Sequence, residues 1–350
     1  MSGGLRSVYS LAMREVHLAA GARMYERGGW SIPEDFGDQA AEYRALREGA
    51  AVMDRSQHSR YMVTGTDALD LLRAALLGHV EDLEEGRAMR SAWLDEDGKI
   101  GDLLLVARTG GIAYLVSGEP SRRLQTLERL RDAAGEGWDV EVSDRTESTC
   151  LVALAGPAAA QVAGRYLSDA LPGRVRPMQA SAFEFHGFRA LAIRSSDTCD
   201  DGFQLMLAPA VAQHIFETLA HAGIPLAGDA AHNVARVEAC IPAWDPDLEP
   251  GLTPAQADID VALGIPGGDE GVILSGVLVE GPRLTPGTAL TSEGRTVGQV
   301  RSCVLSGLGG ATIGLAILES AQATPGTELR AGEARVTVVA KPFYRRRRTD

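Results

Sequence analysis

The sequence predicts an α+β protein with a separate all-β domain at its C-terminal end. Residues 1–240 mix helical and strand periods without the regular alternation that a parallel sheet requires. Residues 242–266 are rich in Pro and Asp, which is typical of a connecting segment that lies mostly on a surface. Short β-type runs then recur between Gly and Pro turns, and these predict a small barrel or sandwich. A chain of 350 residues suits two or three domains.

Apolar periodicity and turn residues define the elements of the first half. Asp67 is a good N-cap, and Leu69, Leu72 and Leu76 follow it on one helical face. Gly110-Gly111 allows the strand that follows it to return antiparallel. Residues 12–30 are predicted to begin as a helix and to end in Gly28-Gly29-Trp30. The other predicted helices are 38–49, 67–77 and 121–134, and the predicted strands are 93–106 with an internal turn, 112–116, 138–143 and 150–155.

The second half continues with both periods and then becomes entirely β. Pro157 is compatible with the first turn of a new helix, where its missing N–H would have no partner within the helix. Further helices are predicted at 210–222 and 228–240, strands at 181–194 and 202–207, and the β-type runs of the C-terminal domain at 271–280, 296–305, 312–318 and 335–340.

Composition limits the classes of function. The formal net charge of −13, with acidic and basic residues mixed along the chain, argues against nucleic acid as the main partner. No stretch approaches the length of a membrane span. The four cysteines lie far apart without a Cys-x-x-Cys pair, and the histidines form no metal-binding motif, so we expect reduced thiols, no metal centre and a cytoplasmic location.

Residues 93–106 stand out as a possible site. The stretch is a strand end, an acidic Asp-Gly turn, and then a strongly apolar strand with one carboxylate, Asp102, at its mouth. Such a carboxylate is either a turn residue in water or a functional group held at the edge of a cavity.

Short motifs occur in a specific order over nearly the whole chain. They are Met53-Asp54-Arg55-Ser56 with His58, Leu154-Ala155-Gly156-Pro157-Ala158, Asp200-Asp201-Gly202-Phe203-Gln204, Arg236-Val237-Glu238-Ala239 and Lys341-Pro342-Phe343. In this order they resemble the glycine cleavage T-protein (aminomethyltransferase) superfamily, which also contains folate-dependent demethylases and YgfZ-type folate-binding proteins. The resemblance identifies the chain as a divergent member.

The resemblance implies a three-domain, cloverleaf-like fold that binds tetrahydrofolate near a central channel. We expect an N-terminal α+β folate-binding domain at 1–150, a second α+β domain at 151–265 and a C-terminal β-barrel domain at 266–350.

The opening stretch corresponds to the family's Asn-Glu-x-Gly-Gly-Ile-x-Asp-Asp-Leu, whose second Asp lies against the reactive folate nitrogen. Aligned without a gap, that position is Leu103; with one residue deleted at Lys99-Ile100-Gly101, it is Asp102. We take Asp102 as the catalytic candidate, because only a carboxylate could orient and polarise a folate amine there. A slip of one residue would turn the side chain to the opposite face of the strand.

The resemblance also implies further folate contacts, several of which depart from the family pattern. Asp197 replaces an aromatic residue, Gln204 replaces a carboxylate that would grip the pterin, and His232 replaces an arginine. An amide offers one acceptor oxygen where a carboxylate accepts from two N–H donors, so pterin affinity should fall. A structural helical pair is an equal alternative for two of these residues, Arg236 and Glu238. The predicted cofactor-binding set is Asp102, Arg194, Asp197, Gln204, His232, Arg236 and Glu238.

These expectations lead to two functional hypotheses. The first is a tetrahydrofolate-dependent one-carbon transferase that takes a methyl or aminomethyl group from a small-molecule donor and is not the housekeeping glycine cleavage enzyme. Its rival is a non-catalytic folate-binding or assembly factor of the YgfZ type. A third interpretation, a partner of a lipoyl carrier protein, needs a docking surface that a sequence cannot show. Neither nucleic acid nor a membrane is an expected partner.

Overall fold

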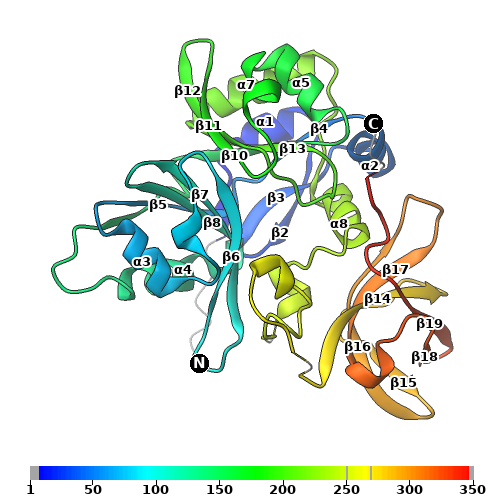
Figure 1. Cartoon of the computed structure of the whole chain (residues 1–350). Coiled ribbons are helices and arrows are strands. Elements are labelled where there is room, and N and C mark those ends of the chain that lie inside the picture. Colours follow the sequence, from blue (N-terminus) through cyan, green and yellow to red (C-terminus); the bar gives the residue numbers. More distant parts are fainter. Residues whose placement is uncertain (1–7, 250, 269, 347–350) are drawn as a thin grey trace, which may run out of the picture. The chain divides into compact units, whose positions relative to one another are not determined.

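The computed structural model describes residues 8–249, 251–268 and 270–346. The chain forms two compact units (Figure 1). Of the described residues, unit 1 contains 8–93, 102–196 and 201–231, and unit 2 contains 94–101, 197–200, 232–249, 251–268 and 270–346.

A short helix and a small sheet begin unit 1. Helix α1 (Arg14–Ala19) is followed by strands β2 (Arg23–Arg27) and β3 (Trp30–Asp35), and β1 (Tyr9–Ser10) pairs with β3. The segment 12–30 thus begins as a helix, as predicted, but the helix ends at Ala19 and the following residues form strands. Gly28 and Gly29 adopt left-handed φ angles of 56° and 81°, which turn the chain into an antiparallel hairpin.

A five-stranded antiparallel sheet follows in the order β6-β7-β8-β5-β9. Two amphipathic helices pack on one face of it, through a core that contains Leu72, Leu104, Val106 and Leu130. The strands are β5 (Ser59–Thr64), β6 (Ala88–Leu94), β7 (Ile100–Gly110), β8 (Ala113–Gly118) and β9 (Glu141–Asp144), and the helices are α3 (Ala68–Ala75) and α4 (Arg123–Asp132).

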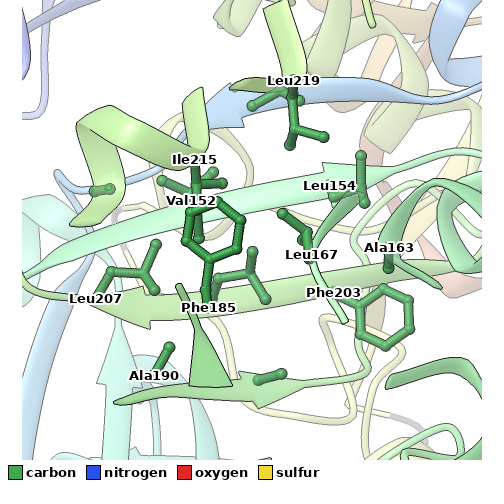
Figure 2. Close-up of a cluster of buried hydrophobic side chains, with 14 of the residues drawn as sticks. Val152, Leu154, Ala163, Leu167, Phe185, Ala190, Phe203, Leu207, Ile215 and Leu219 are labelled. Atoms are coloured by element: carbon green, nitrogen blue, oxygen red, sulfur yellow. The ribbon is translucent and has the colours of Figure 1, made fainter. Parts of the chain in front are cut away.

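A second five-stranded sheet has the order β11-β12-β13-β10-β4. Its largest apolar core lies on one face, where Val152, Leu154, Phe185 and Phe203 pack against α5 and α7 (Figure 2). The strands are β4 (Ala51–Asp54), β10 (Cys150–Ala155), β11 (Ala180–Phe185), β12 (Phe188–Ile193) and β13 (Gly202–Leu207), and the helices are α2 (Gln39–Glu48), α5 (Ala159–Tyr166), α6 (Ala170–Arg174) and α7 (Pro209–His221).

The other faces of the two sheets meet inside unit 1. Leu105, Ala107 and Leu115 from the first sheet form one buried cluster with Ala180 and Ile193 from the second. Each sheet is thus covered on both faces, by helices on one side and by the other sheet on the other side. A side chain on β7 or β13 therefore faces either helices or the partner sheet, according to its place in the strand alternation.

Unit 2 contains the C-terminal part of α8 (Asp229–Glu238) and a closed barrel in the order β14-β17-β16-β15-β18-β19. This confirms the predicted all-β domain as a barrel. The sequence analysis missed two strands of the barrel, β15 and β18, because each has only four residues and so shows little alternation of apolar and polar side chains. The barrel strands are β14 (Val272–Glu280), β15 (Ala289–Ser292), β16 (Arg295–Leu305), β17 (Thr312–Glu319), β18 (Glu328–Ala331) and β19 (Ala334–Val339).

The segment 242–266 differs from the surface connection that its composition predicts. Asp247, Leu248 and Ala257 are buried within it, at 0–2% exposure. It contains a π-helical turn at Trp244–Leu248 and a 3₁₀ turn at Val261–Leu263; other 3₁₀ turns are Val80–Asp82, Pro120–Arg122 and Ser320–Gln322. Among the described residues, no helix is long and apolar enough to cross a membrane.

Candidate functional site

Asp102 lies near the start of β7 and is fully buried. The backbone N–H of Glu119 donates to its Oδ1 over 3.1 Å, and the Thr126 hydroxyl donates to its Oδ2 over 2.6 Å. Trp93 in turn donates its Nε1–H to the Thr126 oxygen over 3.0 Å. The carboxylate therefore ties β7 to α4 and to the segment that follows β8.

Burial raises the pKa of the Asp102 carboxyl well above its ordinary value, and the hydrogen bond from Thr126 opposes that shift. The site is also tightly packed. A Cβ added to Gly118 would lie 2.3 Å from Asp102 Oδ2, so only glycine leaves room for the carboxylate there.

Strand alternation decides which side chain of β7 faces which layer. Asp102 lies on the same face as Leu104, which packs in the core beneath α3 and α4. Leu103 is half-buried and lies on the opposite face, with Leu105 and the second sheet. The carboxylate thus points toward α4, and the side chain directed toward the partner sheet at this position is Leu103.

Gln204 lies on the face of β13 that is directed toward the first sheet. Its neighbours in sequence, Phe203 and Leu205, belong to the core on the opposite face, and it pairs directly with Ile193 of the inter-sheet cluster. Gln204 and Leu103 therefore belong to the same inter-sheet layer of unit 1, whereas Asp102 lies outside that layer.

Arg194 follows β12 and is held by a bidentate ion pair. Its Nε and Nη2 donate to the two carboxylate oxygens of Asp201 over 2.8 and 2.6 Å, and its Nη1 donates to the Val175 carbonyl over 2.9 Å. The guanidinium also lies over the Phe203 ring. Hydrogen bonding to Asp201 raises the pKa of Arg194, so the guanidinium is a permanent cation within this loop.

In unit 2, Arg236 of α8 is the centre of a buried network. Its Nη1 pairs with the carboxylate of Asp247, its Nη2 donates to Ser302 Oγ over 2.8 Å, and its Nε donates to Asn233 Oδ1 over 2.9 Å. Both partners of the ion pair are almost inaccessible, with side-chain exposures of 4% and 0%. This arrangement joins α8 to the 244–248 turn and the barrel.

The remaining predicted residues of unit 2 are two residues of α8, His232 and Glu238, and one residue of the loop before β13, Asp197. His232 is buried and lies one turn before Arg236, on the same helical face. Glu238 is fully buried, and Ser306 Oγ donates to its Oε1 over 2.6 Å. Asp197 is half-buried in the loop before β13. Arg236 and Glu238 thus have the structural partners that the alternative interpretation of this pair expects.

A polar cluster around Asp229 has no counterpart in the sequence analysis. The Tyr25 hydroxyl and the Arg27 guanidinium both donate to Asp229 Oδ2, and Arg55 Nη1 donates to Oδ1 over 3.2 Å. Burial, together with the Asp229 charge, raises the pKa of Tyr25. Burial lowers the pKa of Arg27, but the charges of Asp229 and Tyr25 and the hydrogen bonds to them together raise it above its ordinary value. No local pattern could have indicated the cluster, because Asp229 is 204 residues from Tyr25.

His58 connects this cluster to the Asp102 region. Arg55 Nη2 donates to His58 Nε2 over 2.6 Å, so the ring proton belongs on Nδ1, which donates to the Gly118 carbonyl over 3.2 Å. Gly118 in turn packs against the Asp102 carboxylate. Among the described residues, no group of three or more His, Cys, Asp or Glu side chains could hold a metal ion.

Comparisons with known proteins cover almost the whole chain. A family model described as the GCVT N-terminal domain matches residues 13–265, and one described as the glycine cleavage T-protein C-terminal barrel domain matches residues 274–345. The aminomethyltransferase of Streptomyces avermitilis is 30% identical over an alignment of 365 positions, which covers 96% of this chain and 98% of that protein. The aminomethyltransferase of Thermus thermophilus is 31% identical over 321 residues, covering 89% and 91%.

A solved structure has the same fold. The glycine cleavage system aminomethyltransferase T from Bartonella henselae superposes with a TM-score of 0.87 at 23% identity, over 97% of this chain and 98% of that one. This likeness confirms the fold expected from the sequence motifs, including the C-terminal barrel.

Proposed function

Because the chain belongs to the glycine cleavage T-protein family of aminomethyltransferases, whose members use tetrahydrofolate, we propose that it is a tetrahydrofolate-dependent one-carbon transferase other than the housekeeping glycine cleavage enzyme. One observation carries the second half of this proposal. At the position that β7 directs toward the partner sheet, the side chain is Leu103, and the neighbouring carboxylate, Asp102, is turned toward α4. The matches reported above give no support to a YgfZ-type assembly factor.

In this proposal the inter-sheet layer binds the pterin ring of tetrahydrofolate but does not activate the reactive folate amine. Gln204 brings one amide into a layer that contains Met206 and, by strand alternation, Leu103 and Arg90, whose guanidinium donates to Ser195 Oγ over 3.1 Å. A planar aromatic ring packs well against such a surface, and the amide oxygen can accept one of its N–H groups. Tetrahydrofolate would supply the nucleophilic amine that receives the one-carbon unit. No carboxylate from β7 reaches this layer to polarise that amine.

The donor class follows from this absence of a charged group at Leu103. A donor that is already electrophilic, such as a methylene iminium or a methyl sulfonium, needs orientation rather than acid–base assistance. Such a small-molecule methyl or aminomethyl donor is the preferred substrate. A lipoyl carrier protein that delivers an aminomethyl group remains in the proposal because the relatives are aminomethyltransferases.

We propose that Asp102 is a positioning residue. We also propose that the enzyme is cytoplasmic. The Asp102 carboxylate accepts from the N–H of Glu119 and the hydroxyl of Thr126, and thereby fixes the start of strand β7 beside Leu103. The other predicted contacts, Arg194, Asp197, His232, Arg236 and Glu238, stay predictions. For Arg194 and Arg236, the ion pairs described above favour a role in shaping the surrounding loops.

Calorimetric titration with tetrahydrofolate tests the proposal directly. The wild-type chain should bind, and Gln204→Glu should bind more tightly, because a carboxylate accepts two N–H groups of the pterin. Gln125→Glu, on the exposed face of α4, adds the same charge away from the site and should match the wild type. A folded protein that shows no heat of binding would refute the proposal.

The position of Leu103 also favours a second candidate, a non-catalytic folate-binding protein. A turnover assay separates this candidate from the transferase. The donors are an N-methyl amine, a methylene iminium, a methyl sulfonium and an aminomethylated lipoyl carrier protein, with one-carbon folate as the measured product. The transferase should use a preformed electrophile, and Leu103→Asp should extend turnover to the amine. Binding without turnover of any donor would favour the non-catalytic protein. Unchanged turnover in Asp102→Asn would count against the positioning role.

A further inference from the structure

Two histidines from different elements of unit 1 meet at the protein surface. His186 lies in the turn between β11 and β12, His214 lies in α7, and both side chains are exposed. The hairpin and the helix are neighbours in unit 1 (Figure 1). His186 Nδ1 is 2.9 Å from His214 Nε2, so the two imidazoles share one hydrogen bond. Neither histidine belongs to the predicted folate-binding set.

The turn fixes the position from which His186 projects. Phe185 pairs with Phe188 across the hairpin, which leaves His186 and Gly187 as a two-residue loop. Their φ angles are 49° and 84°. Positive φ at both loop residues is typical of a type I′ turn, whose twist matches that of the flanking strands, and histidine is among the residues enriched at positive φ. Strand pairing therefore holds the backbone that carries this imidazole.

One buried ring supports both imidazoles. Phe185 is 1% exposed and packs in the same core as Ile215 of α7 (Figure 2). The His186 ring stacks on the Phe185 ring, with centroids 4.3 Å apart and an interplanar angle of 13°. The His214 ring lies 5.3 Å from the same phenyl ring, between centroids. Because Phe185 is fixed in the core, contact with it orients both histidines before any ligand binds.

The spacing of the two rings matches the geometry of metal chelation. Neutral imidazole is a ligand of Zn²⁺, Ni²⁺ and Cu²⁺, and its nitrogen binds zinc at about 2.0–2.1 Å. At that distance, two ligand nitrogens are about 2.9 Å apart at a right angle and about 3.3 Å apart at a tetrahedral angle, and the ring centroids are about 4.5 and 5.2 Å apart. The observed separations are 2.9 Å between the nitrogens and 5.0 Å between the centroids. Small side-chain rotations therefore suffice to direct both lone pairs at one ion.

We propose that His186 and His214 form a two-histidine site for a divalent transition-metal ion such as Zn²⁺. His186 binds through Nδ1 and His214 through Nε2, and each neutral ring carries its proton on the other nitrogen. Two metal–nitrogen bonds replace the hydrogen bond between the rings, and water fills the remaining coordination positions. The bound ion joins the β11–β12 hairpin to α7. This site is independent of the proposed transferase activity.

The two ligands agree with the absence, among the described residues, of any group of three or more metal-binding side chains. A structural zinc centre has four protein ligands, so this site is an open and exchangeable one. The sequence contains no motif for it, because the two histidines are 28 positions apart and come from a turn and a helix.

Calorimetric titration of the full, untagged chain with zinc chloride tests the proposal. The wild type should bind Zn²⁺, and His186→Asn and His214→Ala should each weaken binding at least about tenfold, because loss of one ligand removes the chelate. Asparagine is chosen at 186 because it tolerates the positive φ of the turn. His221→Ala removes another exposed histidine of α7, and Cys199→Ser removes an exposed thiol; both should match the wild type.

Electron paramagnetic resonance of bound Cu²⁺ identifies the ligands. The wild-type spectrum should show two imidazole nitrogens, and the spectra of His186→Asn and His214→Ala should show at most one. Circular dichroism verifies that each variant is folded. Three results would overturn the proposal: no Zn²⁺ binding by the folded wild type, equal affinity in the wild type and both ligand variants, or an equally large loss of affinity in His221→Ala or Cys199→Ser.

Discussion

Replacing Thr126 with valine removes one hydroxyl that serves two buried partners. Thr126 is fully buried; it donates to Asp102 Oδ2 over 2.6 Å and accepts from Trp93 Nε1 over 3.0 Å. Valine has nearly the same shape, so no cavity forms. The substitution therefore isolates the loss of hydrogen bonding from the loss of packing.

The expected cost follows from the two groups left without a partner. A hydrogen bond to a charged group contributes roughly 1.5–3 kcal/mol, and a buried N–H without an acceptor costs roughly 1–3 kcal/mol. Because both groups share one site and some local relaxation is expected, the free energy of unfolding should fall by about 3 kcal/mol.

The pH dependence gives this prediction a second test. The folded-state pKa of Asp102 is raised by burial, so its contribution to stability is fully present below the unfolded-state pKa and is lost as the pH rises through the folded-state pKa. Thr126 opposes that shift by bonding the charged form. Thr126→Val should therefore raise the pKa further and cost more at high pH than at low pH.

Urea unfolding of wild type and Thr126→Val at several pH values measures both effects. Thr64→Val, a half-buried threonine of β5 in the same sheet, is the matched control and should change the free energy of unfolding by less than about 0.5 kcal/mol. A Thr126→Val variant within about 0.5 kcal/mol of the wild type would refute the reasoning, as would a cost that does not change with pH.

Three further predictions concern stability and are measured by urea unfolding. Asp247→Ala should cost about 3–5 kcal/mol, because it leaves the buried Arg236 cation without its carboxylate partner. Phe203→Ala should cost about 3–5 kcal/mol through the cavity left in the core, whereas Phe188→Ala, at 55% exposure, should cost less than about 1 kcal/mol; equal costs would contradict this account. Asp102→Asn should remove the loss of stability that the wild type undergoes as the pH rises above about 4, since an amide does not ionise; an unaltered pH profile would show that another group causes it.

Elements with a clear local signal were predicted well. The strand predicted at 150–155 is β10 with the same bounds, and the helix predicted at 67–77 contains α3. The β-type runs of the C-terminal domain contain or overlap β14, β16, β17 and β19. In each case the spacing of apolar residues and the position of turn residues agree with the burial of the segment in the folded chain, so the local sequence favours the same element as the tertiary packing.

The N-terminal segment shows where local pattern fails. Residues 12–30 carry helical residue types, yet the helix ends at Ala19 and the rest pairs as a hairpin. Pairing with β3 and the burial of Trp30 and Ile32 outweigh the weak helical preference of residues 23–27. The division into three domains at 1–150, 151–265 and 266–350 stays a prediction.

The sequence by itself determined the family, the α+β class, the C-terminal β domain and the choice of two neighbouring residues on one strand as the position of interest. The tertiary structure assigned each of them to a face of that strand, because both faces are covered: Asp102 meets Thr126 of α4, and strand alternation directs Leu103, like Leu105, toward the partner sheet. The partners of Asp229 likewise depend on packing between segments that are distant in the chain. Hydrogen bonds of this kind leave no periodic trace in the sequence, since neither partner constrains its own neighbours.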